Sequence, residues 1–342
     1  MEQSRLEAQQ AFVNNNGWSN ADLFPLPADA STRTYTRLIK DGESRLLMDS
    51  PSESEKLSEF IQISEHLIRL GLRAPKVFAS DVPAGLALVE DFGENTFTRL
   101  LNAGAEALPL YLQAADVLIH LHHAGADAVQ IDLPTYNMDT LLREAELFIK
   151  WFVPAARGEE VSVSEEETFF AVWRDVLSDV SKDKSAFVLR DFHVDNLMIV
   201  PESNSLRACG LLDFQDALLG PVAYDMVSLL EDARRDVPTD IKNEVLDHYF
   251  GACPTLDRTV FETEMKVLGA QRHAKVAGIF VRLSVLGGKH VYLQHLPRVL
   301  TLLQNSLASP VLDDVRFVME KLIPELTDQA RLISLTQKIQ EE

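Results

Sequence analysis

The sequence has few cysteines, no long apolar run and a deficit of basic residues. Two cysteines occur in 342 residues, which excludes a disulfide scaffold and the paired cysteines of a zinc finger. This usage fits a reducing compartment, so we expect a cytoplasmic protein. The apolar stretch at 276–285 is short and interrupted by Arg282, so no transmembrane span is expected. Residues 1–10 lack the apolar core of a secretory signal, and none is expected.

The charge balance excludes further classes of protein. There are 32 basic and 52 acidic residues, which gives a formal net charge of −20. A nucleic-acid backbone or an anionic membrane would be repelled by most of such a surface, so we expect neither partner. The apolar content of 46% predicts a large buried core, and the length suits two lobes. The sequence leaves the oligomeric state open, and a monomer is compatible with it.

The first part of the chain predicts a small lobe rich in strands. Four segments have the composition and bounding turns of strands: 34–39, 45–48, 76–80 and 86–90. Asp41-Gly42 supplies a hairpin turn between the first two. Ser52 and Glu55 have the spacing of a capping box, which opens a helix that Gly71 ends. The predicted order is therefore strand, strand, helix, strand, strand.

Beyond residue 92 the apolar residues repeat mainly with helical period. Helices are predicted at 108–123, from a cap at Asp139 to 151, from a Ser164 cap to about 181, and over most of the chain after 222. They are interrupted by short strands: 187–189, 197–200 and 208–212. We therefore predict an α+β fold with a small lobe over 1–92 and a larger, mainly helical lobe over 93–342.

The short strands carry the clearest functional signal. Asp191 is followed five residues later by Asn196, and a strand ends at Asp213. Phosphoryl transfer from ATP needs a carboxylate that accepts or orients the acceptor's proton, and oxygen ligands for Mg²⁺. We predict Asp191 as that base and Asn196 and Asp213 as ligands, because hard oxygens suit Mg²⁺ and not zinc. The alternative is two acidic loops that merely solvate a turn.

These motifs resemble the catalytic and metal-binding loops of the protein-kinase-like superfamily, and most closely its aminoglycoside phosphotransferase branch. The segment from Gly220 to Asp225 is similar to the one that follows the metal-binding aspartate there. The resemblance implies a two-lobe kinase fold, in which ATP and Mg²⁺ bind between a small antiparallel sheet with one helix and a helical lobe. It also implies that Arg190 and Asp225 brace the catalytic loop.

A narrower resemblance extends from about residue 25 to 307. Five segments are similar to the bacterial anomeric kinases of N-acetylmuramate and N-acetylglucosamine: 29–35, 47–51, 143–148, 213–217 and 271–280. The resemblance to this subgroup implies that the protein transfers a phosphoryl group from ATP to the anomeric hydroxyl of one or both amino sugars. The product is a sugar 1-phosphate that enters cell-wall recycling, and the expected partner is a small sugar.

The expected phosphate site departs from most of the superfamily. Met48 stands where a strand lysine usually binds the α- and β-phosphates, although the sugar-kinase subgroup shares this methionine. Arg33 or Arg37 could supply the missing positive charge, and a solvated strand arginine is the alternative for each. Ser31 and Thr32 could bind phosphates through backbone N–H groups and hydroxyls, or form an ordinary turn.

The remaining predictions concern adenine and the acceptor. Val89 and Asp91, at the end of the last strand, mark the expected adenine edge. In the acceptor site we predict Glu144, His193, Arg272 and Lys275.

Arg272 and Lys275 are three residues apart and share a helix face. A guanidinium could bind the lactyl carboxylate of N-acetylmuramate, or form a salt bridge on the helix surface. Glu144 could accept hydrogen bonds from sugar hydroxyls, or pair with the catalytic loop together with Arg143.

Two other functions stay open at this point. One is a phosphotransferase for another small alcohol or an aminoglycoside, since acidic walls suit cationic acceptors. The other is a regulatory pseudokinase that binds ATP without turnover. The missing strand lysine favours the pseudokinase, whereas the intact Asp191, Asn196 and Asp213 argue against it.

Overall fold

The computed structural model describes residues 2–27, 33–51, 54–201, 206–327 and 339. The chain divides into two compact units: Met1–Ile131 with Leu189–Ala217, and Asp132–Val188 with Leu218–Glu342. The sheet and the catalytic loop expected from the sequence both belong to the first unit. The lobe boundary expected near residue 92, between the sheet and the helices that follow it, remains a prediction.

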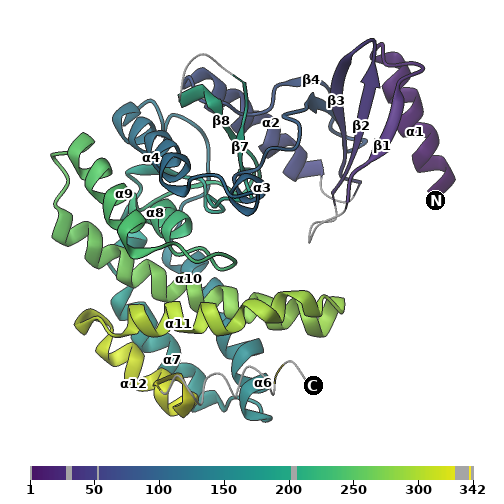
Figure 1. Cartoon of the computed structure of the whole chain (residues 1–342). Helices are drawn as coiled ribbons and strands as arrows, with labels where there is room; N and C mark the ends of the chain where they lie inside the picture. Colours follow the sequence, from purple (N-terminus) through teal and green to yellow (C-terminus); the bar gives the residue numbers. More distant parts are fainter. Residues whose placement is uncertain (1, 28–32, 52–53, 202–205, 328–338, 340–342) are drawn as a thin grey trace. The chain divides into compact units, whose positions relative to one another are not determined.

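The first unit contains a five-stranded antiparallel sheet (Figure 1). Its strands, in the order β1-β2-β3-β5-β4, are β1 (Asp22–Pro25), β2 (Thr34–Lys40), β3 (Glu43–Asp49), β4 (Val77–Asp81) and β5 (Leu86–Glu90). The four predicted strands are confirmed, each within about two residues. β1 escaped prediction because all four of its residues are exposed, so it carries no alternation of buried and exposed positions.

An N-terminal helix, α1 (Glu2–Asn15), was also missed, so the small lobe has two helices instead of one. Its one buried side chain with a core role is Val13, which packs on a cluster from the sheet: Leu38, Leu47, Leu86 and Leu88. A single buried residue leaves no apolar stripe to detect. Arg5 holds the helix to the sheet, since its Nε donates to Asp49 Oδ1 at 3.0 Å and its Nη1 to the Ala84 carbonyl at 2.6 Å.

The predicted helix after β3 is α2 (Ser54–Arg69), and it stops before Gly71 as expected, where φ is +88°. Ser52, the predicted cap, lies outside the described residues. Phe60 of α2 stacks on Phe214 with ring centroids 5.2 Å apart and planes 12° apart. This contact places α2 beside the segment that follows Asp213.

Two helices and a hairpin complete the first unit: α3 (Phe97–Asn102), α4 (Ala107–Ala124), β7 (Leu197–Ile199), η3 (Leu206–Ala208) and β8 (Cys209–Leu211). Backbone bonds from Leu211 to Arg73, and from Ile199 to Asn95, tie the hairpin to the rest of the unit. Gly210 is needed here because a Cβ atom would lie 2.9 Å from the Phe92 ring. The hairpin therefore holds the loop that precedes β7 and the segment that follows β8 in a set position.

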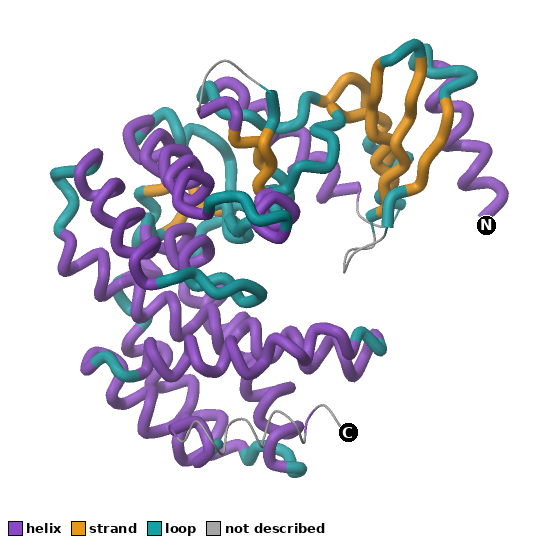
Figure 2. The backbone as a smooth tube through the Cα atoms, in the orientation of Figure 1, coloured by secondary structure: helices purple, strands orange, loops and turns teal. Residues whose placement is uncertain are grey.

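The second unit is mainly helical, as predicted, and Figure 2 shows it almost entirely in helix colour. Its elements are α5 (Met138–Leu147), the π-helical turn η1 (Phe148–Phe152), α6 (Val153–Arg157), α7 (Val163–Val176), η2 (Val180–Lys182), β6 (Ala186–Val188), β9 (Leu218–Gly220), α8 (Ala223–Leu230), α9 (Thr239–Ala252), α10 (Arg258–Gly287), η4 (His290–His295), α11 (Leu296–Leu307), η5 (Pro310–Leu312), α12 (Asp313–Leu322) and η6 (Pro324–Thr327). Among the described residues, no helix combines the length and apolarity that crossing a membrane requires.

Two predicted helix caps are wrong by two residues. Asn137, not Asp139, caps α5 and accepts a hydrogen bond from the Thr140 N–H at 3.0 Å. Ser162, not Ser164, caps α7 in a capping box with Glu165. Each segment offers several residues able to cap, and the approach of the preceding chain selects among them.

The longest helix, α10, has 30 residues and is buried along most of its middle. Gly278 faces the end of α5 so closely that a Cβ atom would lie 2.2 Å from the Leu147 carbonyl oxygen. α5 changes to the π-helical turn η1 directly after Leu147, at the point where the backbones of α5 and α10 meet. α5 and α10 therefore approach each other backbone to backbone here, whereas α8 contacts α10 nearer its middle, through Tyr224 and Arg272.

Candidate active site

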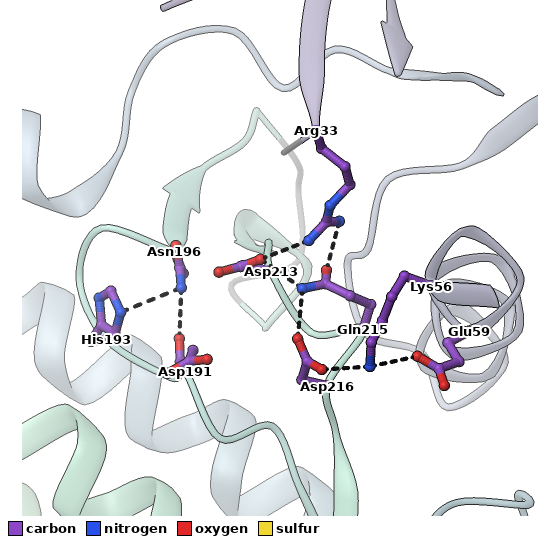
Figure 3. Close-up of polar contacts among 9 residues, drawn as sticks. All are labelled: Arg33, Lys56, Glu59, Asp191, His193, Asn196, Asp213, Gln215 and Asp216. Carbon is purple, nitrogen blue, oxygen red and sulfur yellow. Dashed lines mark hydrogen bonds and ion pairs between the residues drawn. The ribbon is translucent and has the colours of Figure 1, made fainter. Parts of the chain in front are cut away.

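The loop after β6 folds back on itself through backbone hydrogen bonds. The Asp191 N–H donates to the Leu189 carbonyl at 2.9 Å, and the Asn196 N–H to the His193 carbonyl at 2.9 Å. Arg190 has a φ of +68°, a conformation that side-chain-bearing residues adopt at a cost. These turns bring the side-chain amide of Asn196 against the backbone carbonyl of Asp191 (Figure 3).

Asn196 is oriented by its own loop. Its Nδ2 donates to the Asp191 carbonyl at 2.9 Å, so Oδ1 is the atom left to bind a ligand. The Leu212 N–H donates to the Asn196 carbonyl at 2.9 Å. This backbone bond joins the catalytic loop to the segment that carries Asp213.

Asp213 is held in a strained backbone conformation with φ at +55°. Its side chain is 47% exposed, so the carboxylate is reachable from solvent. Loss of hydration, and then the nearby negative charge of Asp191, raise the pKa of Asp213 above its ordinary value, against the opposing effects of Gln215 and Arg33. The two carboxylates are therefore close enough to repel each other.

This arrangement fits a magnesium ion. A divalent cation relieves repulsion between two carboxylates, and Mg²⁺ is commonly held by one or two carboxylates together with substrate phosphates. In the part of the chain that the structure describes, no group of three or more His, Cys, Asp or Glu side chains could hold a metal. A cation held by Asp213 would therefore need an oxygen of another kind beside it, and the Asn196 Oδ1 atom is the one predicted to supply it.

The structure separates the two arginines proposed to replace the strand lysine. Arg33 is buried, its Nη1 donates to Gln215 Oε1 at 3.0 Å, and its Nη2 lies 3.5 Å from Asp213 Oδ1. Arg37 instead binds both oxygens of Asp91, at 2.6 and 3.1 Å. The hydrogen bond to Asp91 raises the pKa of Arg37. Of these two cations, Arg33 is the one beside the expected metal ligand.

Three site residues have no counterpart in the sequence-based predictions: Lys56, Gln215 and Asp216. Lys56 of α2 donates to Asp216 Oδ1 at 2.7 Å and lies 2.9 Å from Glu59 Oε2. Burial opposes ionisation of Asp216, but the hydrogen bond and charge of Lys56 outweigh it and lower the pKa of Asp216. Lys56 reads in the sequence as one more lysine on a polar helix face, so only its tertiary contact reveals it.

Arg190 and His193 lie in the same network. Arg190 Nη1 donates to the Asp216 carbonyl at 3.3 Å, and its bracing role remains a prediction. His193 lies 3.4 Å from Asn196 Nδ2 and 4.0 Å from Asp195 Oδ2. Asp195 accepts a hydrogen bond from Thr98, which ties the loop to α3.

The predicted nucleotide contacts divide into described and undescribed residues. Val89 is buried in β5, and Asp91 is bound by Arg37 directly after the strand. Met48 is fully buried. Ser31 and Thr32 lie outside the described residues. The adenine edge and the phosphate-binding turn remain predictions.

The predicted acceptor residues Glu144 and Lys275 are paired within the second unit. Lys275 Nζ donates to Glu144 Oε1 at 2.8 Å, and both side chains are 10% exposed. Gln271 Nε2 and the Tyr136 hydroxyl donate to Glu144 Oε2. The salt bridge between Lys275 and Glu144 is therefore a buried one. Arg143 contacts Thr140 at 3.3 Å on the exposed side of α5.

Arg272 is likewise buried, with 6% exposure, so the alternative of a salt bridge on the helix surface is wrong for it. Its Nη1 donates to the Tyr224 hydroxyl at 3.1 Å, and its guanidinium lies 5.4 Å from the centre of that ring. Asp225, the next residue of α8, is 3% exposed. Its bracing of the catalytic loop remains a prediction, as do the sugar contacts of Arg272.

Comparison with known proteins gives three consistent matches. A curated N-acetylmuramate/N-acetylglucosamine kinase of Caulobacter vibrioides is 32% identical over 353 aligned positions, which cover 94% of this chain and 97% of that protein. Among solved structures, a choline kinase of Streptococcus pneumoniae has a TM-score of 0.63 at 14% identity, covering 89% of this chain and 99% of that one. An ADP-bound aminoglycoside phosphotransferase has a TM-score of 0.59 at 14% identity, covering 96% and 99%.

The fold is thus that of the kinase-like phosphotransferases, and the predicted fold class is confirmed. Residues 22–259 match the phosphotransferase enzyme family, which is most of the chain. The protein belongs to this family and is a phosphotransferase. The resemblance inferred from the sequence motifs is confirmed.

Proposed function

We propose that this protein is an ATP- and Mg²⁺-dependent kinase that phosphorylates the anomeric hydroxyl of N-acetylmuramate, N-acetylglucosamine or both. The observation that carries the proposal is the 32% identity to the Caulobacter vibrioides kinase over nearly the full length of both proteins. The chain has Asp191, Asn196 and Asp213 together, and the carboxylate of Asp213 is accessible to solvent. This set supports turnover instead of nucleotide binding alone. Because the reaction consumes ATP and a recycled wall sugar, we place it in the cytoplasm.

In the proposed reaction the anomeric oxygen attacks the γ-phosphorus of ATP, the bond to ADP breaks, and the sugar 1-phosphate forms. Asp191 orients the hydroxyl and takes its proton late, since phosphoryl transfer has a loose transition state. Bound Mg²⁺ supplies the charge that neutralises the phosphate oxygens. Asn196 Oδ1 and Asp213 are the groups that would hold the ion.

We assign the charge of the missing strand lysine to Arg33. It lies within 3.5 Å of Asp213, so a phosphate that shares a cation with Asp213 would also be within reach of the guanidinium. Arg37 is a poorer candidate because Asp91 already occupies its bidentate face. Ser31 and Thr32 remain the proposed phosphate-binding turn, with Val89 and Asp91 at the adenine edge.

For the acceptor we retain Glu144, His193, Arg272 and Lys275 as proposed contacts, with Arg272 as the reader of the lactyl carboxylate. Lys275 is less suited than Arg272 to bind the lactyl carboxylate, since the charge of Glu144 already neutralises that of Lys275. Arg272→Ala should raise the KM for N-acetylmuramate more than that for N-acetylglucosamine, which lacks the carboxylate. An equal change for both sugars would remove Arg272 from this role.

The direct test is ADP release from the purified protein with Mg-ATP and a panel of acceptors. The panel contains N-acetylmuramate, N-acetylglucosamine, kanamycin and choline, and phosphorus NMR identifies the product. The proposal expects a signal from an anomeric phosphate that depends on the amino sugar and is lost in Asp191→Asn. Turnover with kanamycin or choline alone would assign another acceptor. ATP binding without turnover on any acceptor would indicate the pseudokinase.

A further inference from the structure

Three charged groups of the site meet at one amide, that of Gln215. Its Oε1 accepts from Arg33 Nη1 at 3.0 Å, and its Nε2 donates to Asp213 Oδ1 at 2.8 Å and to Asp216 Oδ2 at 3.3 Å. Gln215 is 4% exposed, so water does not substitute for these partners. The reverse orientation would put the amide nitrogen against the guanidinium and the oxygen against two carboxylates. The charges around Gln215 therefore fix its orientation.

The network ends on α2 at Lys56, which donates to Asp216 Oδ1 at 2.7 Å. Figure 3 shows the chain of contacts running from Lys56 through Asp216 and Gln215 to Asp213 and Arg33. One helical turn after Lys56, Phe60 stacks on Phe214. An ion pair and a ring contact on the same helix face thus hold the Asp213–Asp216 segment from one side.

In protein kinases an ion pair between a strand lysine and a helix glutamate couples a helix to the phosphate site. Here the strand position is Met48, which is fully buried and carries no charge. We propose that Lys56 is a positioning residue for this phosphotransferase: its ion pair with Asp216 reverses the usual polarity and holds Gln215, and through it Asp213 and Arg33, in the arrangement that binds Mg-ATP. This inference rests on the proposed function.

The effect expected from losing Lys56 follows from the contacts. Lys56 touches Asp216 and Glu59 and none of Asp191, Asn196 or Asp213 among the contacts in Figure 3, so it acts through the segment and not on the reacting atoms. Without it, the Gln215 amide nitrogen faces two carboxylates, one of which has lost its cation. Asp216 then competes with Asp213 for the amide, and the metal ligand loses its fixed position. Binding of Mg-ATP and kcat should fall, whereas the KM for the sugar should not change.

The test uses Lys56→Met in the full-length protein, because methionine keeps the length and removes the charge. The apparent half-saturating Mg²⁺ concentration should rise, or kcat fall, by about 10- to 100-fold, the usual effect of removing a group that orients a metal ligand. Glu59→Gln is the matched control, since it removes the other partner of Lys56 and leaves the Lys56–Asp216 pair. It should change neither quantity, and Lys56→Arg should recover part of the loss.

A double-mutant cycle separates positioning from general destabilisation. Asp216→Asn should reproduce the effect of Lys56→Met, and the double variant should be no worse than either single variant. The proposal would be overturned if the losses of the two single variants multiplied in the double variant, or if Glu59→Gln caused the same loss as Lys56→Met. Asp216→Asn also tests the pair from its other end if Lys56→Met fails to fold.

Failure of this inference can be told apart from failure of the proposed function. Titration of Mg-ATP into each variant, measured by calorimetry, needs no acceptor. Unchanged Mg-ATP binding and unchanged kcat in Lys56→Met would refute the role of Lys56. A wild-type protein that binds Mg-ATP but releases no ADP with either amino sugar would refute the acceptor assignment, while the binding titration would still decide the role of Lys56.

Discussion

The buried pair of Lys275 and Glu144 allows a quantitative test of whether these two residues serve the fold. Their charged atoms lie 2.8 Å apart and both side chains are 10% exposed. Lys275→Met removes the charge while keeping the shape of the side chain, so no cavity forms. The carboxylate of Glu144 then remains buried without a compensating cation.

The free energy of unfolding should fall by about 3 kcal/mol, the low end of the cost of breaking a buried pair by removing one partner. The low end applies because Gln271 and Tyr136 still donate to Glu144. Adding Glu144→Gln to Lys275→Met removes the unpaired charge and keeps both of those hydrogen bonds. The double variant should therefore recover most of the lost stability.

Urea unfolding followed by tryptophan fluorescence measures this change, since Trp173 is fully buried in the same unit. Lys150→Met is the control: its pair with Glu146 is exposed on the lysine side and should contribute less than about 1 kcal/mol. A loss below 1 kcal/mol, together with a raised KM for the sugar, would refute the structural role.

Three further predictions follow from single contacts. Asp191→Ala should lower kcat about a thousandfold if Asp191 is the base, with an unchanged unfolding curve; retained turnover in single-turnover assays contradicts the role. Gly278→Ala should lower the free energy of unfolding by about 2 kcal/mol, because its Cβ would lie 2.2 Å from the Leu147 oxygen; an unchanged melting temperature would refute that reading. Burial, and then the charge of His123, lower the pKa of His122 to about 4. The unfolded chain takes up a proton at this imidazole below about pH 6.5, whereas the folded protein resists it. The free energy of unfolding is therefore unaffected by His122 above about pH 6.5 and falls as the pH is lowered towards 4. His122→Asn should lessen this acid loss by about 2 kcal/mol, and equal pH profiles of unfolding for both proteins would contradict it.

Patterns within short segments predicted much of the fold. The strands β2 to β5 were found because hairpin turns and alternating apolar residues are local properties of the chain. β1 and α1 were missed because they bury too little to show a periodic pattern. The cap positions at Asn137 and Ser162 were misplaced by two residues because neighbouring side chains could cap equally well.

The catalytic loop could be read from the sequence for a similar reason. Asp191 and Asn196 are five residues apart, and the turns between them are closed by bonds within the loop itself. The shape of this loop is therefore a local property, and so is the oxygen chemistry that suits Mg²⁺. Asp213 follows from the strand that precedes it.

The sequence by itself determined the family and the alternation of elements and was enough to propose these three side chains, because each depends on residues close together in the chain. Tertiary structure alone decided which charges meet. Arg33 and Gln215 are 182 positions apart, Lys56 and Asp216 are 160 apart, and Glu144 and Lys275 are 131 apart. In an acidic protein each of these cations has many possible partners, and the packing of α2, α5 and α10 selects one, since burial makes an unpaired charge too costly to leave.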